Sequence, residues 1–156
     1  STQKLTYFDE EKKVHVVPHV LEPTVGLDRA FLAVLTSAYK EEGEGENMRT
    51  VLMFPKHIAP VLCAVSPLLK NKPELVAKAR EIYSSLKKEF GRVMWDDNSN
   101  IGKRYRRQDE IGTPFCITID FETLEGDTKD TVTVRKRDDA TQTRIPISEL
   151  PSFLKS

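Results

Sequence analysis

The stretch between residues 61 and 95 constrains the fold of this chain more than any other. A continuous apolar run at residues 61–65 is typical of a strand that is covered on both faces. Residues 73–90 then place apolar side chains at helical spacing, begin with a proline and are followed by a glycine. The short apolar stretch "RVMW" comes next. A strand, a helix and a strand in this order predict parallel strands with a right-handed crossover, and therefore an α/β fold.

Further elements extend this unit. The stretch from Asn98 to Asn100 can cap a helix that continues to about Ile111. The alternating stretches "FCITIDF" and "TVTVRKR" predict two strands joined by a polar hairpin loop. The C-terminal residues predict a short strand edge and then a helix capped by Ser148. The expected architecture is a mixed sheet of about five strands that is flanked by helices.

The N-terminal part predicts a separate unit. Residues 14–23 read as a strand that ends in a turn, and Gly26 opens a helix with one apolar stripe. The acidic, glycine-containing stretch at residues 41–47 is most simply a solvated loop. We therefore expect a domain boundary here, between residues 1–46 and residues 47–156.

Composition excludes several classes of protein. Lys plus Arg and Asp plus Glu balance at 24 each, so no net charge attracts the chain to nucleic acid or to a membrane. No apolar segment approaches the length of a membrane span, and no signal peptide is visible. Cys63 and Cys116 lie in apolar runs, which indicates buried, reduced thiols and a cytoplasmic protein without a disulfide.

Motifs for catalysis or metal binding are missing from the sequence. The three histidines have no metal-ligand spacing with either cysteine, and neither cysteine has a flanking base. The sequence contains no nucleophile elbow, no phosphate-binding loop and no dinucleotide fingerprint. We therefore expect no catalytic residue and no metal ligand in this chain.

Positive charge is concentrated on the predicted helix in "IGKRYRRQDEIG". At 100° per residue, Ile101 and Tyr105 point toward the sheet, and the cations span an outward arc of about 160°. The helix should therefore carry a cationic outer face. Its members are Lys103, Arg104, Arg106 and Arg107.

The predicted strands carry polar residues on one face. The period of two places Val132 and Val134 on the apolar side, and Thr133, Arg135 and Arg137 on the other. On the neighbouring strand, Asp120 and Thr118 share the polar side, and the inward side chains are Phe115, Ile117, Ile119 and Phe121.

Two interpretations of these charges stay open on the pattern alone. Arg106 could form weak pairs with Asp109 and Glu110 on a solvated helix. Arg135 and Arg137 could protect an edge strand from pairing with another chain. The competing interpretation is nucleic-acid binding, because guanidinium groups on a strand suit planar bases and phosphates.

Two stretches resemble a known family. "EPTVGLDR" resembles motif 3 of class II aminoacyl-tRNA synthetases, in the form "EPSxGxDR" that is typical of glycyl-tRNA synthetases. "DDNSNIGKRYRRQDEIGTPFCITIDFETL", followed by "DTVTVRKRD", is similar to the C-terminal anticodon-binding domain of the homodimeric class II type of this family. The resemblance implies a three-layer anticodon-binding domain, preceded by a strand and a helix of a class II catalytic domain.

The resemblance also implies ligand contacts in motif 3. Arg29 matches the arginine that binds the γ-phosphate of ATP, which the parent enzyme uses with Mg²⁺. This position suits an anion, because the first helical turn has free backbone N–H groups. Glu22 matches the glutamate that binds the amino group of glycine, and Thr24 stands where the family usually has serine.

The same resemblance implies contacts with tRNA-Gly. Glycine anticodons end in two cytosines, and Arg135, Arg137 and Asp120 have the donors and acceptor that cytosines require. We expect these residues to recognise the bases, and Lys103 with the other helix cations to position the tRNA backbone.

The family's motifs 1 and 2 have no counterpart in this sequence. We therefore expect a C-terminal fragment of a homodimeric, ATP-dependent glycine–tRNA ligase that binds no cofactor and does not aminoacylate by itself. One alternative is a non-catalytic, synthetase-like accessory subunit, although such a subunit would have no use for Arg29 or Glu22. Another is a protein-interaction domain with incidental arginines.

Overall fold

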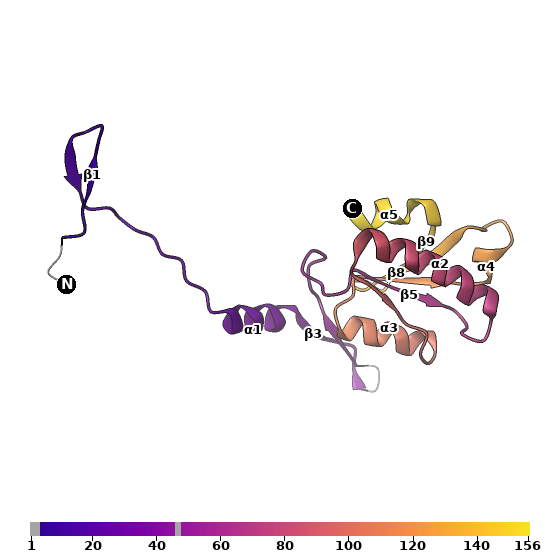
Figure 1. The fold of residues 1–156 in the computed structure, drawn as a ribbon. Helices are drawn as coiled ribbons and strands as arrows, with labels where there is room; N and C mark the ends of the chain where they lie inside the picture. Colours follow the sequence, from indigo (N-terminus) through magenta and orange to yellow (C-terminus); the bar gives the residue numbers. More distant parts are fainter. Residues whose placement is uncertain (1–3, 46–47) are drawn as a thin grey trace. The chain divides into compact units, whose positions relative to one another are not determined.

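The computed structural model describes residues 4–45 and 48–156 of the chain (Figure 1). The chain divides into two compact units, Ser1–Leu32 and Ala33–Ser156. The boundary that we expect between residues 46 and 47 separates a catalytic domain from an anticodon-binding domain. Compactness does not test that assignment, which stays a prediction.

The first unit contains one short hairpin and the start of a helix. Strand β1 (Tyr7–Asp9) pairs antiparallel with β2 (Val14–Val16), so the predicted strand at residues 14–23 is much shorter than expected. Helix α1 (Leu27–Ala38) begins after Gly26, as predicted, and continues into the second unit. Its apolar stripe is largely exposed: Leu27 is 83% and Phe31 is 64% accessible.

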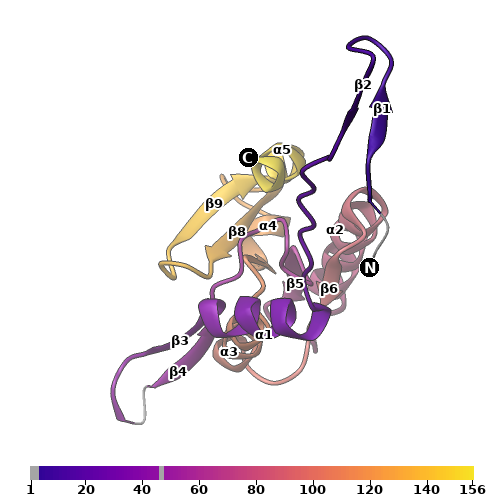
Figure 2. The ribbon, with the colours of Figure 1, turned by 90° about the vertical axis from the view of Figure 1, so that its left-hand side faces the viewer.

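A second hairpin follows α1. Strand β3 (Tyr39–Glu42) pairs antiparallel with β4 (Arg49–Leu52), and β4 packs beside helix α3 (Ile101–Glu110) (Figure 2). The prediction of a loop at residues 41–47 is therefore wrong for its first two residues, which lie in β3. Residues 46 and 47 lie outside the described part of the chain.

The second unit contains the predicted mixed sheet of five strands. The strand order is β6-β5-β7-β8-β9. Strand β5 pairs parallel with both β6 and β7, so the predicted parallel pairing of β5 and β6 is confirmed. Strand β8 is antiparallel to both of its neighbours. The strands are β5 (Cys63–Pro67), β6 (Val93–Trp95), β7 (Phe115–Ile119), β8 (Thr131–Lys136) and β9 (Gln142–Pro146).

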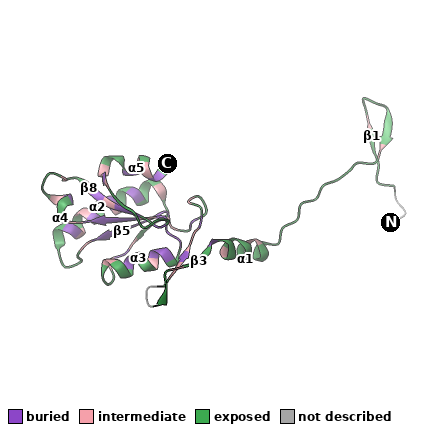
Figure 3. Ribbon diagram, turned by 180° about the vertical axis from the view of Figure 1, so that it is seen from behind, coloured by how far each residue is buried: buried purple, intermediate pink, exposed green. Residues whose placement is uncertain are grey.

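Helices cover both faces of this sheet and complete three layers. Helix α2 (Pro73–Phe90) and helix α5 (Leu150–Lys155) pack on the apolar face, and α3 lies on the opposite face (Figures 1 and 3). No helix in the described ranges is long and apolar enough to cross a membrane. The buried core between α2, α5 and the sheet includes Val65, Leu75, Ile82, Ile117, Ile119, Val132, Val134, Leu150 and Leu154.

Two local predictions are wrong because short helices replace extended chain. Asp120 caps helix α4 (Phe121–Leu124) through Thr123 N, so Phe121 leaves the strand and is 42% exposed instead of pointing inward. Ser148 lies in the 3-10 helix η2 (Ile147–Glu149) and does not cap α5. The N-cap residue of α5 is Glu149, whose side chain makes no capping hydrogen bond.

The two cysteines are buried free thiols, as predicted. Burial raises the pKa of Cys63 and that of Cys116 to about 12 in each case. A thiol with such a pKa stays protonated at neutral pH and is a poor nucleophile.

Candidate nucleic-acid interface

Two of the four predicted helix cations lie on the solvent-facing side of α3. The Asn100 side chain accepts a hydrogen bond from Lys103 N (2.9 Å) and so caps this helix as predicted. The Lys103 and Arg106 side chains are exposed, and neither forms an ion pair with any residue that the structure describes. Both cations are therefore placed as the sequence predicts, and both can contact a phosphate.

Arg104 does not belong to the cationic face. It is 3% exposed, and its guanidinium donates to the carbonyl oxygens of Pro67, Asp97 (3.2 Å) and Ser99 (2.8 Å). The prediction that Arg104 points outward is therefore wrong, because the side chain ties the start of α3 to the end of β5. All of these partners are backbone carbonyls, which no sequence pattern reveals.

Arg107 is half-buried and paired. Its Nη2 lies 2.8 Å from Asp96 Oδ1, and it also donates to the Asn98 carbonyl oxygen (2.7 Å). Burial raises the pKa of Asp96, but hydrogen bonds from Arg107, Asn98 N and Gln108 outweigh it and keep that pKa below its ordinary value. Arg107 therefore has a structural partner and is only partly available to a ligand.

Arg135 is buried beneath α3, not exposed on an open sheet face. It is 6% accessible and donates through both terminal nitrogens to Asp109, at 2.8 and 3.0 Å. Its guanidinium carbon lies 4.8 Å from the ring centroid of Tyr105. The predicted strand face is confirmed, but the predicted exposure is wrong because α3 covers that face. The base-recognition role that we expected for Arg135 thereby loses its structural basis.

Arg137 is buried as well. It is 4% accessible and donates to the carbonyl oxygens of Leu52 (3.0 Å), Phe54 (2.9 Å) and Gly112 (2.8 Å). Its remaining contact is an ion pair with Asp138 (2.6 Å). The predicted exposure of Arg137 is also wrong, since the side chain joins the chain after β4 to the loop after α3.

Asp120 belongs to a partly exposed polar cluster with a residue that the sequence did not single out. Arg144, on β9, contacts Asp120 through two nitrogens, at 2.7 and 2.9 Å, and contacts Glu122 at 3.1 Å. Thr133 donates to the Asp120 carboxylate (3.2 Å), and Thr131 accepts from Arg144 Nε (2.7 Å). The Arg144 and Asp120 side chains keep 24% and 19% of their surface exposed.

We call this set the Arg144 cluster. It presents hydrogen-bond donors beside ionised acceptors, and its members are Thr131, Thr133, Asp120, Glu122 and Arg144. Burial raises the pKa of Asp120, but the hydrogen bond and charge of Arg144 outweigh it, and the pKa lies below its ordinary value. Asp120 therefore stays a carboxylate at neutral pH and acts only as an acceptor. A partly exposed guanidinium next to such a carboxylate can bind the polar edge of an unstacked base.

Arg144 could in part have been found from the sequence. Gln142 and Arg144 alternate with Thr143 and Ile145, which is the pattern of a half-buried strand. The contact with Asp120 could not have been found, because it depends on the register that places Arg144 opposite Thr133. Glu122 lies in the stretch that we predicted as a loop, so no strand or helix pattern indicated where its side chain points.

The motif 3 residues lie in a different part of the chain. Glu22 and Thr24 are exposed in the extended segment before α1, and Arg29 is exposed in its first turn. No hydrogen bond joins these three side chains within the part of the chain that the structure describes. The described residues also contain no cluster of three or more His, Cys, Asp or Glu that could hold a metal ion.

Comparisons with known proteins identify the family to which the sheet domain belongs. Residues 62–156 match the family model of the anticodon binding domain. The chain is 48% identical to a glycine–tRNA ligase of Clostridium kluyveri, over 99% of this chain and 32% of that protein. The corresponding enzymes of Mesoplasma florum and Thermus thermophilus are 48% and 45% identical, over 100% and 99% of this chain.

The chain spans about a third of the length of these curated relatives. The matched region contains the whole five-stranded sheet, helix α3 and the Arg144 cluster. Since this region makes up more than half of the chain, the protein belongs to the anticodon binding domain family.

Proposed function

We propose that this chain is the C-terminal part of a glycine–tRNA ligase and that its second unit binds the anticodon of tRNA-Gly. The observation that carries the proposal is the Arg144 cluster, a partly exposed set of donors and ionised acceptors inside the anticodon binding domain. Relatives named glycine–tRNA ligase, which match over nearly the whole chain, support the choice of amino acid.

The chemistry of the cluster suits cytosine. The cytosine edge offers an N4 amino donor beside acceptors at N3 and O2. The exposed Glu122 carboxylate can accept from the amino group, and the Arg144 guanidinium, which Asp120 holds in place, can donate to the ring acceptors. The cytosines of a glycine anticodon are then recognised by Arg144 and Glu122, in place of Arg135 and Arg137.

Changing Arg144 to glutamine should remove this selectivity. We expect affinity for a stem-loop with the glycine anticodon to fall by about 10- to 100-fold, since one bidentate recognition contact is worth about 1–3 kcal/mol. Affinity for a loop with both cytosines replaced should hardly change. Filter binding with the two loops measures the difference, and Arg80→Gln, which changes an exposed arginine on α2 outside the cluster, is the control. Equal losses on both loops would contradict the role of Arg144.

The exposed cations of α3 should act on the RNA backbone and not on the bases. A double change of Lys103→Ala and Arg106→Ala should weaken both stem-loops equally. It should also reduce the slope of log affinity against log salt by about 1.5, because two phosphate contacts are lost at roughly 0.7–0.9 each. A loss that is confined to the glycine loop, with an unchanged slope, would refute this division of roles.

The first unit supplies part of the catalytic site in the same proposal. Arg29 would bind the γ-phosphate of ATP, and Glu22 and Thr24 would bind glycine, in a homodimeric parent enzyme that uses Mg²⁺. The exposed apolar stripe of α1 supports this assignment, because Leu27 and Phe31 are left without the core that a catalytic domain would provide. Since motifs 1 and 2 are missing, the chain alone should not charge tRNA.

A further inference from the structure

A pocket of about 380 Å³ lies where β7 begins and β8 ends. Its volume falls in the range of small-molecule sites. Phe54, Pro114, Phe115 and Phe153 form its apolar wall, and the Phe115 and Phe153 ring centroids lie 5.4 Å apart with the rings inclined at 63°. These rings provide flat apolar surface against which a planar group can pack.

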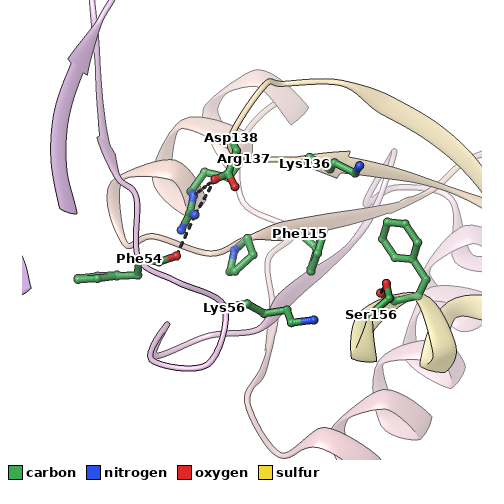
Figure 4. Close-up of a pocket in the computed structure, with 9 residues that line it drawn as sticks. Phe54, Lys56, Phe115, Lys136, Arg137, Asp138 and Ser156 are labelled. Atoms are coloured by element: carbon green, nitrogen blue, oxygen red, sulfur yellow. Dashed lines mark hydrogen bonds and ion pairs between the residues drawn. The ribbon is translucent and has the colours of Figure 1, made fainter. Parts of the chain in front are cut away.

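Two lysines give this pocket a positive charge. Lys56 and Lys136 extend on either side of Phe115 in Figure 4. Within the described ranges, no carboxylate lies at ion-pair distance from the Lys136 ammonium. Lys56 donates to a backbone carbonyl of α5 at 3.1 Å and keeps further donors free. The acidic residue of the pocket, Asp138, is already paired with Arg137.

The combination of rings and ammonium groups restricts the class of ligand. An apolar molecule would leave both lysines without a counterion, and a simple anion would leave the rings without a partner. A molecule with one planar aromatic part and one phosphate satisfies both. We propose that this pocket binds a single nucleotide, with its base against Phe115 and Phe153 and its phosphate between Lys56 and Lys136.

This nucleotide pocket is distinct from the Arg144 cluster. Phe115 begins β7 and Asp120 follows its last residue, so the two lie about 17 Å apart at the usual rise of a strand. The proposal does not rest on glycine anticodon recognition, because the ligand chemistry is that of any nucleotide. The nucleotide could be free or could belong to a bound RNA, and the two sources are separated in the test below.

The test is a titration of the ¹⁵N-labelled chain with cytidine and adenosine 5′-monophosphates, followed by NMR. We expect saturable shifts at the Phe115, Lys136 and Phe153 amides. The double change Lys56→Ala and Lys136→Ala should weaken binding at least tenfold. Lys129→Ala, which changes an exposed lysine in the loop before β8, should leave it unchanged. Shifts that do not saturate, or that are equal in the double variant, would overturn the proposal.

Inorganic phosphate separates nucleotide binding from simple anion binding. If phosphate alone binds as tightly as the mononucleotides, the rings contribute nothing and the proposal fails. Displacement of cytidine monophosphate by excess tRNA-Gly supports the pocket and assigns it to an RNA nucleotide, whereas retention supports a free nucleotide. Arg144→Gln should keep mononucleotide binding, so a failure of anticodon recognition is distinguished from a failure of this pocket.

Discussion

Replacing Asp109 with asparagine should lower the free energy of unfolding by about 3–5 kcal/mol, because it leaves the buried Arg135 without its counterion. Asp109 is 1% exposed and accepts from both terminal nitrogens of Arg135. It also accepts from Arg49 at 2.8 Å. Asparagine has almost the same size, so the loss would measure charge and hydrogen bonding and not a cavity. Urea unfolding of the two proteins provides the comparison.

A neighbouring carboxylate offers the control. Glu110 is exposed on the same helix, and Glu110→Gln should change stability by less than about 0.5 kcal/mol. Combining Asp109→Asn with Arg135→Met should cost less than the sum of the single changes, because the second change removes the unpaired charge. A loss below about 1 kcal/mol for Asp109→Asn would show that water or a rearranged partner already compensates the arginines.

The contacts of Asp109 link three elements that are far apart along the chain. Arg49 comes from β4 and Arg135 from β8, and both meet Asp109 near the end of α3. Arg49 is held in turn by Glu42 of β3. The β3–β4 hairpin, which belongs to the second unit, is therefore attached to the sheet domain through ion pairs as well as through the packing of β4 beside α3.

The sequence predicted the fold well because local patterns report local structure. The apolar run before residue 67, the stripe of α2 and the alternation in β7 and β8 all reflect burial in a core of ordinary hydrophobic residues. A cap within Asn98 to Asn100 was predicted, and Asn100 provides it, because capping depends on nearby residues alone. Together with the resemblance in motif 3 and the basic helix, these patterns were enough to identify the family.

The placement of the arginines could not be predicted in the same way. The buried side of α3 is polar, since Arg104, Gln108 and Asp109 face the protein, so hydrophobic periodicity does not reveal which side is covered. A period of two assigned Arg135 to the correct face of its strand but gives no information about a third layer above that face. Buried arginines are satisfied by distant carbonyls and carboxylates, which only the tertiary structure brings together.

The contacts of the Arg144 cluster could not be predicted from the sequence either. Arg144 and Asp120 are 24 residues apart; Arg144 lies on β9 and Asp120 directly follows β7, and these two strands do not pair with each other. Their contact needs the register of β7 against β8 and of β8 against β9 to be correct at once. A shift of one residue in either pair would move Arg144 to the other face. The resemblance identified the domain, but the residues that make its polar surface had to come from the structure.

Changing Gly112 to alanine is expected to destabilise the protein by about 2–5 kcal/mol, from roughly 1–2 for a left-handed backbone and 1–3 for overpacking. Gly112 has φ +79°, and the amides of Gly112 and Thr113 donate to the Asp109 and Gln108 carbonyl oxygens at the end of α3. An added Cβ would lie 2.5 Å from a ring carbon of Phe54 and 2.8 Å from the Leu52 carbonyl oxygen. Thermal or urea unfolding measures the loss.

Gly91 separates the two contributions to this loss. It follows α2 with φ +71° and ψ −47° but has no atom within 4 Å of an added Cβ, so Gly91→Ala should lose only the backbone contribution, about 1–3 kcal/mol. The additional loss of stability in Gly112→Ala then measures how closely the chain after β4 packs against the end of α3. Arg137 donates to carbonyl oxygens on both sides of this contact. If the two glycine variants were equally stable, the chain after β4 would have to be free to move, and Arg137 could not be holding the hairpin against the domain.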